Sequence, residues 1–288
     1  MSKIINILTW VLLSTSMILL MGFSSSKRGQ QTYLGVDILI DKPANSGFVT
    51  QKNIETLFTN MGYGKENQPL SVINIGQLEA KLTNKPSIES ANVYQTISGK
   101  VIISVKERTP IVRIYNQHNE SFYIDQYGSL MPLSNQYSAR VLIANGNIDI
   151  PLSTVNTLEN LENRLNAIFK KSNTTAIENT ELVNKLLSEE EALPGVNQLK
   201  GLFDMSQYIN SNEFWKSQIS QLYFNENKDI IMTPRIGNHS IVFGSLENFE
   251  EKFEKLMTFY KKGLNKTGWN EYSEINLKYK NQVVCTKR

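Results

Sequence analysis

The sequence predicts an α+β protein in three parts: a transmembrane helix at the N-terminus, a small β-α-α-β-β module, and a mixed β-sheet domain with helices. The first observation is the uncharged stretch 4–23, which is followed by a long polar chain with no second stretch of this kind. The second is the order of strand-like and helical periodicities over residues 33–107. The third is the return to short strands after residue 219, interrupted by one amphipathic helix.

Residues 4–23 have the length of a membrane-spanning helix. At about 1.5 Å of rise per residue, they reach about 30 Å, which is the thickness of the bilayer hydrocarbon core. A cleaved signal peptide is the alternative, and Ser24 and Ser26 offer it a weak cleavage site. Its apolar region is usually shorter, about 7–15 residues. We therefore predict an uncleaved signal anchor, with residues 1–3 in the cytoplasm and the bulk of the chain exported.

Composition argues against nucleic-acid binding and excludes one means of stabilisation. The 288 residues carry a net charge of +3 with a pI near 8.7, which is too mild to indicate a nucleic-acid-binding protein. Cys285 is the only cysteine, so an internal disulfide is impossible. The exported part must be stabilised by core packing.

The module after the anchor begins with an apolar, β-prone run over 33–40. A helix is predicted between the N-cap Thr50 and the terminator Gly62, and a second helix over 75–82. Two alternating runs then follow, joined by the turn Ser98-Gly99, and these predict a strand pair.

The remaining chain is predicted to be mainly strands with three helical regions. Strands are expected over 111–115, 121–125, 140–144, 219–224, 230–235, 240–243, 274–279 and 282–285. Helices are expected in the polar insert 151–194, over 196–209, and in an amphipathic segment from Leu246 to Tyr260 that Gly263 would end.

Few side chains suit catalysis or metal binding. His118 and His239 are the only histidines, and both lie in turn-like contexts, so we expect exposed loop residues. No zinc-binding, nucleotide-binding or nucleophile motif occurs, which predicts that the protein is not an enzyme and holds no metal or cofactor. Cys285 fits a small buried apolar residue. Scattered carboxylates leave a glycan-cleaving pair open, although no pair stands out.

Several short motifs occur in the order found in one protein family. The segment 105–133 combines V-K-E-R-x-P with F-Y-I-D-x-x-G-x-x-M-P-L, and D-I-I-M-x-P, I-V-F-G and I-N-L-K-Y follow at 229–234, 241–244 and 275–279. In this order they resemble the bacterial cell-division family FtsQ/DivIB. The preceding module resembles its POTRA domain. The resemblance implies a POTRA domain at 33–107 and an FtsQ-type β domain at 108–288.

The resemblance also implies a function. Family members are non-catalytic, single-pass scaffolds of the divisome, held in the inner membrane at the septum with the C-terminal bulk in the periplasm. They recruit FtsB- and FtsL-type coiled-coil proteins and, through them, the septal wall synthase. No nucleic acid, small-molecule substrate or cofactor is implied. An extended FtsB-type segment would pair with a sheet edge by β-augmentation. The implied partner-binding residues are Leu277, Lys278, Tyr279, Lys280, Asn281, Val283 and Val284.

Each of these residues also has a structural interpretation. Leu277 and Val284 suit a hydrophobic core, and Tyr279 suits either a core or an interface. Lys278 and Lys280 suit charged residues that prevent non-specific pairing of an edge strand. The functional alternatives are a POTRA-containing envelope assembly or chaperone protein, and an enzyme that acts on wall polymer.

Overall fold

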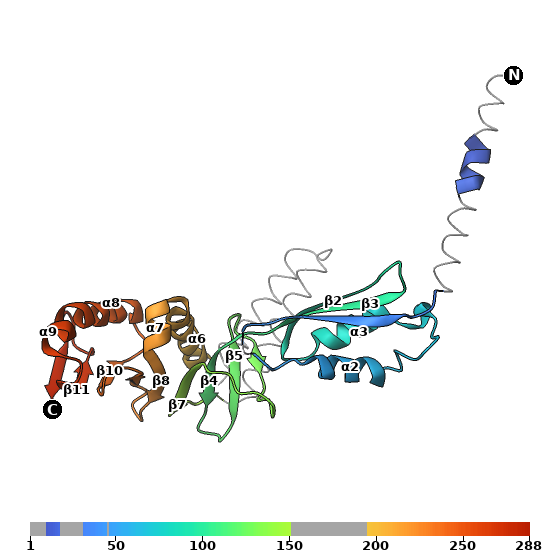
Figure 1. Ribbon diagram of the computed structural model, residues 1–288. Coiled ribbons are helices and arrows are strands. Elements are labelled where there is room, and N and C mark those ends of the chain that lie inside the picture. The colour runs from blue at the N-terminus through green and yellow to red at the C-terminus, as the bar shows by residue number, and fades with distance from the viewer. Residues whose placement is uncertain (1–9, 18–30, 45, 151–194) are drawn as a thin grey trace, which may run out of the picture. The chain divides into compact units, whose positions relative to one another are not determined.

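The computed structural model describes residues 10–17, 31–44, 46–150 and 195–288 (Figure 1). Contacts within the chain divide it into two compact units, Met1–Arg108 and Thr109–Arg288. Residues 10–17 are helical and exposed, and the rest of the predicted anchor 4–23 lies outside the described residues. Within the described ranges, no helix has both the length and the apolar character needed to cross a membrane.

The first unit has the predicted β-α-α-β-β order around a three-stranded sheet. Its sheet order is β1-β3-β2, with β1 parallel and β2 antiparallel to the central β3. The elements are β1 (Gly35–Asp41), α2 (Gln51–Asn60), the short 3₁₀ turn η1 (Leu70–Val72), α3 (Ile75–Thr83), β2 (Ile88–Gln95) and β3 (Lys100–Glu107).

Both helices of the first unit begin at side-chain caps. Thr50 accepts a hydrogen bond from the backbone N–H of Asn53, and Asn74 accepts one from the backbone N–H of Gln77 at 3.0 Å. Each cap satisfies a backbone donor that the first turn leaves without a helical partner. Past the end of α2, Gly62 adopts a φ of 81°, as the sequence predicts for a helix terminator.

The core of the first unit lies between the two helices and one face of the sheet. Alternate residues of β3, Val101, Ile103 and Val105, are completely buried, whereas the residues between them are not. Helix residues such as Phe58 and Leu78 pack against this face. The alternation of the sequence therefore sets which face of the sheet is covered.

The second unit contains a mixed nine-stranded sheet within the described residues. Its order is β12-β11-β10-β9-β8-β7-β4-β5-β6, with parallel pairs at β10–β11, β7–β8 and β4–β7. The elements are β4 (Pro110–Tyr115), β5 (Ser121–Asp125), β6 (Leu130–Met131), β7 (Leu142–Gly146), α6 (Val196–Ser211), α7 (Glu213–Gln218), β8 (Ile219–Phe224), β9 (Ile230–Pro234), β10 (Ser240–Gly244), α8 (Phe249–Phe259), the π-helical turn η2 (Tyr260–Leu264), α9 (Asn265–Thr267), β11 (Tyr272–Asn276) and β12 (Val284–Lys287).

An aromatic cluster joins the helices of the second unit to its sheet. The ring of Phe253, on α8, lies 5.0 Å from the rings of both Trp215 on α7 and Phe243 on β10. Tyr208 on α6 stands 5.1 Å from the same phenylalanine. Helix α8 is therefore fixed against β10 by packing on its apolar side, as its amphipathic pattern predicts.

Two predicted element boundaries and one predicted exposure are wrong. The strand predicted over 274–279 ends at Asn276, because its side-chain oxygen accepts the backbone N–H of Lys278 and turns the chain. The helix continues past Gly263 through η2, and the glycine with positive φ beyond it is Gly268, at 100°. His239 is buried rather than exposed, with its Nε2 3.0 Å from the hydroxyl of Tyr260. The predicted helices of the insert 151–194 lie outside the described residues.

Candidate functional site

The second unit ends in a strand with a free side. Strand β12 is last in the sheet order and pairs with β11 alone, through registers such as Ile275 with Cys285 and Asn276 with Val284. In an antiparallel ladder, alternate residues point their N–H and C=O groups away from the neighbouring strand. Among the described residues, no strand lies beyond β12 to pair with these groups. The edge is thus a template for one added strand.

The loop between β11 and β12, residues 277–283, is held in place by the contacts of two lysines. Lys255 on α8 donates from Nζ to the carbonyl oxygens of Leu277 at 3.3 Å and Tyr279 at 3.0 Å. Lys278, within the loop, forms an ion pair with Asp229, which precedes β9, at 2.6 Å. That carboxylate raises the pKa of Lys278 by hydrogen bonding and charge attraction. The loop is therefore ordered by contacts of its backbone and of one lysine.

Lys278 also explains a glycine on the neighbouring strand. Gly244, at the end of β10, has a φ of 82°, and a Cβ added there would lie 2.9 Å from Cγ of Lys278. Because Gly244 has no side chain, the aliphatic part of Lys278 can pass over it and reach Asp229.

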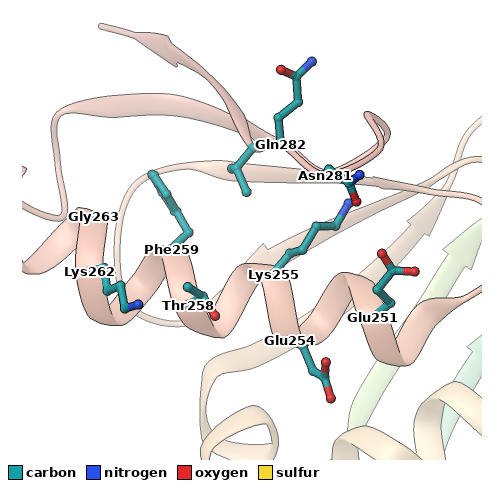
Figure 2. A pocket seen from close by; sticks show the side chains of 10 residues that line it. Glu251, Glu254, Lys255, Thr258, Phe259, Lys262, Gly263, Asn281 and Gln282 are labelled. Carbon is teal, nitrogen blue, oxygen red and sulfur yellow. The ribbon is translucent and has the colours of Figure 1, made fainter.

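An open groove of about 580 Å³ separates α8 from this loop. Figure 2 shows Lys255 and Phe259 extending from α8 toward the loop that carries Asn281 and Gln282, while Glu254 points away. The lining residues are Glu251, Glu254, Lys255, Thr258, Phe259, Lys262, Gly263, Asn281, Gln282 and Val283. Phe259 and Val283 give the groove an apolar part, and the charged residues of α8 surround it.

Phe259 owes its position to a close approach within the helix. A Cβ on Gly263 would come within 2.8 Å of the Phe259 ring, so the ring lies directly over this glycine. The ring also packs against Tyr272 of β11, with 5.9 Å between centroids. The π-helical turn η2 contains Gly263 and keeps the helix continuous there. Gly263 therefore leaves room for the Phe259 ring that lines the groove, and it does not end the helix.

The structure distributes the seven predicted partner-binding residues over three environments. Leu277 is completely buried in the core of the second unit, where its backbone N–H donates to Val242 at 2.9 Å. Asn281 and Val283 line the groove. Exposed side chains belong to Lys278, Tyr279, Lys280 and Val284. The core interpretation thus fits Leu277 and fails for Val284, which is 42 % exposed at the start of the edge strand.

Sequence reasoning missed the helical wall of the groove. Glu251, Lys255, Thr258 and Lys262 recur at spacings of four, three and four residues, which places them on one side of a helix. Phe259 interrupts this polar stripe and is only partly buried. An aromatic residue beside a charged stripe of helical spacing was the signal available in the sequence.

Within the described ranges, no group of three or more His, Cys, Asp or Glu residues is placed to hold a metal ion. His118 pairs with Asp149 at 3.0 Å on the surface, and this hydrogen bond lowers the pKa of Asp149. Cys285 is half-buried on β12 and packs against the core, and burial raises the pKa of its thiol. A raised pKa disfavours the reactive thiolate.

Fold and site together define a class: a two-unit α+β protein that presents an open sheet edge and an adjacent groove. Comparison with known families gives two matches. The family model described as FtsQ/DivIB, C-terminal related, matches residues 109–286, and the model of the POTRA-like domain matches residues 34–106. The chain therefore belongs to the FtsQ/DivIB family, as its motifs predict. No curated protein matches the chain significantly.

Family membership assigns a general role. FtsQ/DivIB proteins are non-catalytic, membrane-associated proteins of bacterial cell division, and membership in the family gives the chain a role in cell division. The protein–protein interactions typical of the family direct attention to the free edge of β12.

Proposed function

We propose that the protein is a single-pass membrane scaffold of the divisome that recruits FtsB- and FtsL-type partners to the septum and links them to septal wall synthesis. Residues 4–23 anchor it in the inner membrane, with residues 1–3 in the cytoplasm. The POTRA domain 33–107 and the β domain 108–288 lie in the periplasm. The observation that carries the proposal is the unpaired edge of β12 beside the α8 groove.

The edge suits an extended partner segment in length and chemistry. Each backbone hydrogen bond that an added strand makes contributes about 0.5–1.5 kcal/mol net. A four-residue strand such as β12 offers few such bonds, so pairing alone supports only weak binding. An apolar side chain of the partner that enters the groove over Phe259 and Val283 would supply the rest.

Tyr279 belongs to the loop that leads into β12. Its side chain is 49 % exposed, and its own carbonyl is held by Lys255. A substitution there alters the side chain without removing a core contact. We propose it as the main aromatic contact, with Lys278, Lys280, Asn281, Val283 and Val284 as its neighbours and Leu277 as the buried support beneath them.

The direct test measures binding of the full-length chain to the FtsB-type protein of the same organism. Tyr279→Glu is expected to weaken binding by about 2 kcal/mol or more, which is at least about 30-fold, while the fold is retained. Tyr127→Glu is the matched control, since Tyr127 is 59 % exposed in the turn before β6, at the opposite end of the sheet. Equal binding by the wild type and Tyr279→Glu would remove this edge as the site.

A cellular test addresses the role itself. A fluorescent fusion of the full chain is expected at the septum, and depletion is expected to give filaments or failed constriction. Uniform envelope signal with normal division would contradict the scaffold and favour the envelope-assembly alternative.

A further inference from the structure

Three exposed apolar side chains gather at one end of the first unit. Ile97, in the turn between β2 and β3, is 94 % exposed, Leu34, just before β1, is 68 % exposed, and Val72, in η1, is 53 % exposed. We call these three residues the apolar end. In Figure 1 the turn between β2 and β3 lies at the same end of the unit as the start of β1. Grouped exposed apolar residues are typical of surfaces that bind another protein or a membrane.

Hydrogen bonds hold the three segments together. The side-chain amide of Gln31 donates to the carbonyl of Ile97, and the carbonyl of Gln31 accepts from the backbone N–H of Leu70 at 2.7 Å. The backbone N–H of Leu34 donates to the carbonyl of Gly99 at 2.9 Å. The chain therefore enters the first unit between the two loops that carry Val72 and Ile97.

The segments that form this end carry no charge. No Asp, Glu, Lys or Arg occurs in residues 31–36, 67–78 or 91–99. Just beyond these segments, Lys100 is neutralised by an ion pair with Asp37 at 3.0 Å. Moving such a surface out of water avoids the large cost of desolvating an ionised group. Apolar tips without a basic patch suit the interface of a bilayer whatever the charge of its lipids.

The length of the preceding chain limits where this end can lie. Gln31 follows the last residue of the proposed anchor, Phe23, by eight residues. A fully extended chain spans at most about 3.6 Å per residue, so Gln31 lies within about 29 Å of the end of the anchor. A short tether of this kind gives the bilayer surface a high effective concentration at the apolar end.

We infer that the apolar end rests in the headgroup region of the bilayer, with Ile97 entering furthest. This inference rests on the proposed anchor, because the tether argument requires residues 4–23 to remain in the membrane. The insertion orients the first unit so that β2 and β3 run away from the lipid surface. Shallow apolar insertion supplements the anchor and does not replace it.

The test uses the full-length chain, with Cys285→Ser, in vesicles of phosphatidylcholine. An environment-sensitive fluorophore is attached in turn to Ile97→Cys, Val72→Cys and the control Asn84→Cys. Asn84 is the exposed C-cap of α3, near the start of β2, so it lies about one strand length, roughly 27 Å, from the Ile97 turn. Labels at 97 and 72 are expected to shift to shorter wavelength and to lose emission to shallow spin-labelled lipids, and the label at 84 is not.

A second variant separates insertion from mere proximity. Ile97→Asp, in the chain labelled at Val72→Cys, is expected to reduce quenching at 72, because a buried carboxylate opposes insertion. Unchanged quenching at 72 would show that the tether alone holds the unit near lipid, and would overturn the inference.

Flotation of the vesicles distinguishes this inference from the anchor on which it rests. A chain that fails to float with the vesicles overturns both. A chain that floats but shows no greater quenching at 97 than at 84 overturns the insertion and leaves the anchored scaffold intact.

Discussion

Lys255→Met tests whether the loop 277–283 must be held in place for partner binding. Lys255 makes two hydrogen bonds from a charged donor, to Leu277 at 3.3 Å and to Tyr279 at 3.0 Å. Such bonds are worth about 1.5–3 kcal/mol each when buried, and partial exposure here reduces the sum to about 1–2 kcal/mol. Methionine keeps the helix propensity and the apolar stem, so the loss isolates the ammonium group.

Two measurements report the loss of the two Lys255 hydrogen bonds. Amide hydrogen exchange of residues 278–283 is expected to accelerate, because the loop opens without unfolding of the sheet. Affinity for an FtsB-type partner is expected to fall by about 5- to 30-fold, which corresponds to about 1–2 kcal/mol of loop ordering that binding must now supply.

Lys252→Met is the matched control on the same helix. Lys252 donates to the carbonyl of Ser245 at 2.7 Å and lies 5.2 Å from the ring centre of Phe243, so it stabilises the start of α8 and not the loop. The control is expected to lower thermal stability without changing loop exchange or affinity. Equal loss of affinity in both variants, or unchanged exchange in Lys255→Met, would refute the reasoning.

Three further predictions concern stability. Burial and the charge of Arg288 lower the pKa of His239, so the folded protein favours the neutral imidazole. The free energy of unfolding is therefore expected to fall as the pH drops below about 6.5, the unfolded value, toward the lower pKa of the folded state. His239→Gln should flatten this pH dependence in denaturant titrations. Gly146→Ala places a Cβ 2.2 Å from the carbonyl oxygen of Phe224 at a φ of 96°, and about 2–5 kcal/mol of destabilisation is expected by chemical denaturation. Phe253→Ala empties the centre of the aromatic cluster and is expected to cost about 3–5 kcal/mol, seen as a lower melting temperature.

Local signals in the sequence predict the first unit well. Thr50 caps the start of α2 and Gly62 follows its end, as the sequence predicts. The alternating apolar residues of β3 face the helices. Short-range backbone chemistry and one buried face fix these features, so tertiary contacts do not override them. The parallel pairing of β1 with β3 joins segments far apart in the sequence, and no local pattern carries that information.

Two predictions for the second unit, one of them at the site, failed for different reasons. The predicted strand over 274–279 has good alternation, but Asn276 bonds the next turn of backbone and ends the ladder there. His239 lies between turn residues, yet it is buried beside Tyr260, whose pKa burial raises to about 12. The end of the strand is decided by a side chain that competes locally with the backbone, and the burial of His239 is decided by packing against a residue distant in the chain.

The edge and the groove arise from one stretch of the topology. Strands β10 and β11 are parallel, and a parallel pair requires a crossover, which α8, η2 and α9 supply. The crossover helix packs its apolar side on the sheet through Phe253, and its polar stripe, with Lys255, then faces the loop that follows β11. Because β12 returns antiparallel outside β11, it becomes the sheet edge beside that stripe. A partner strand on β12 would therefore meet the groove, and binding is expected to depend on α8 residues that never touch the edge itself.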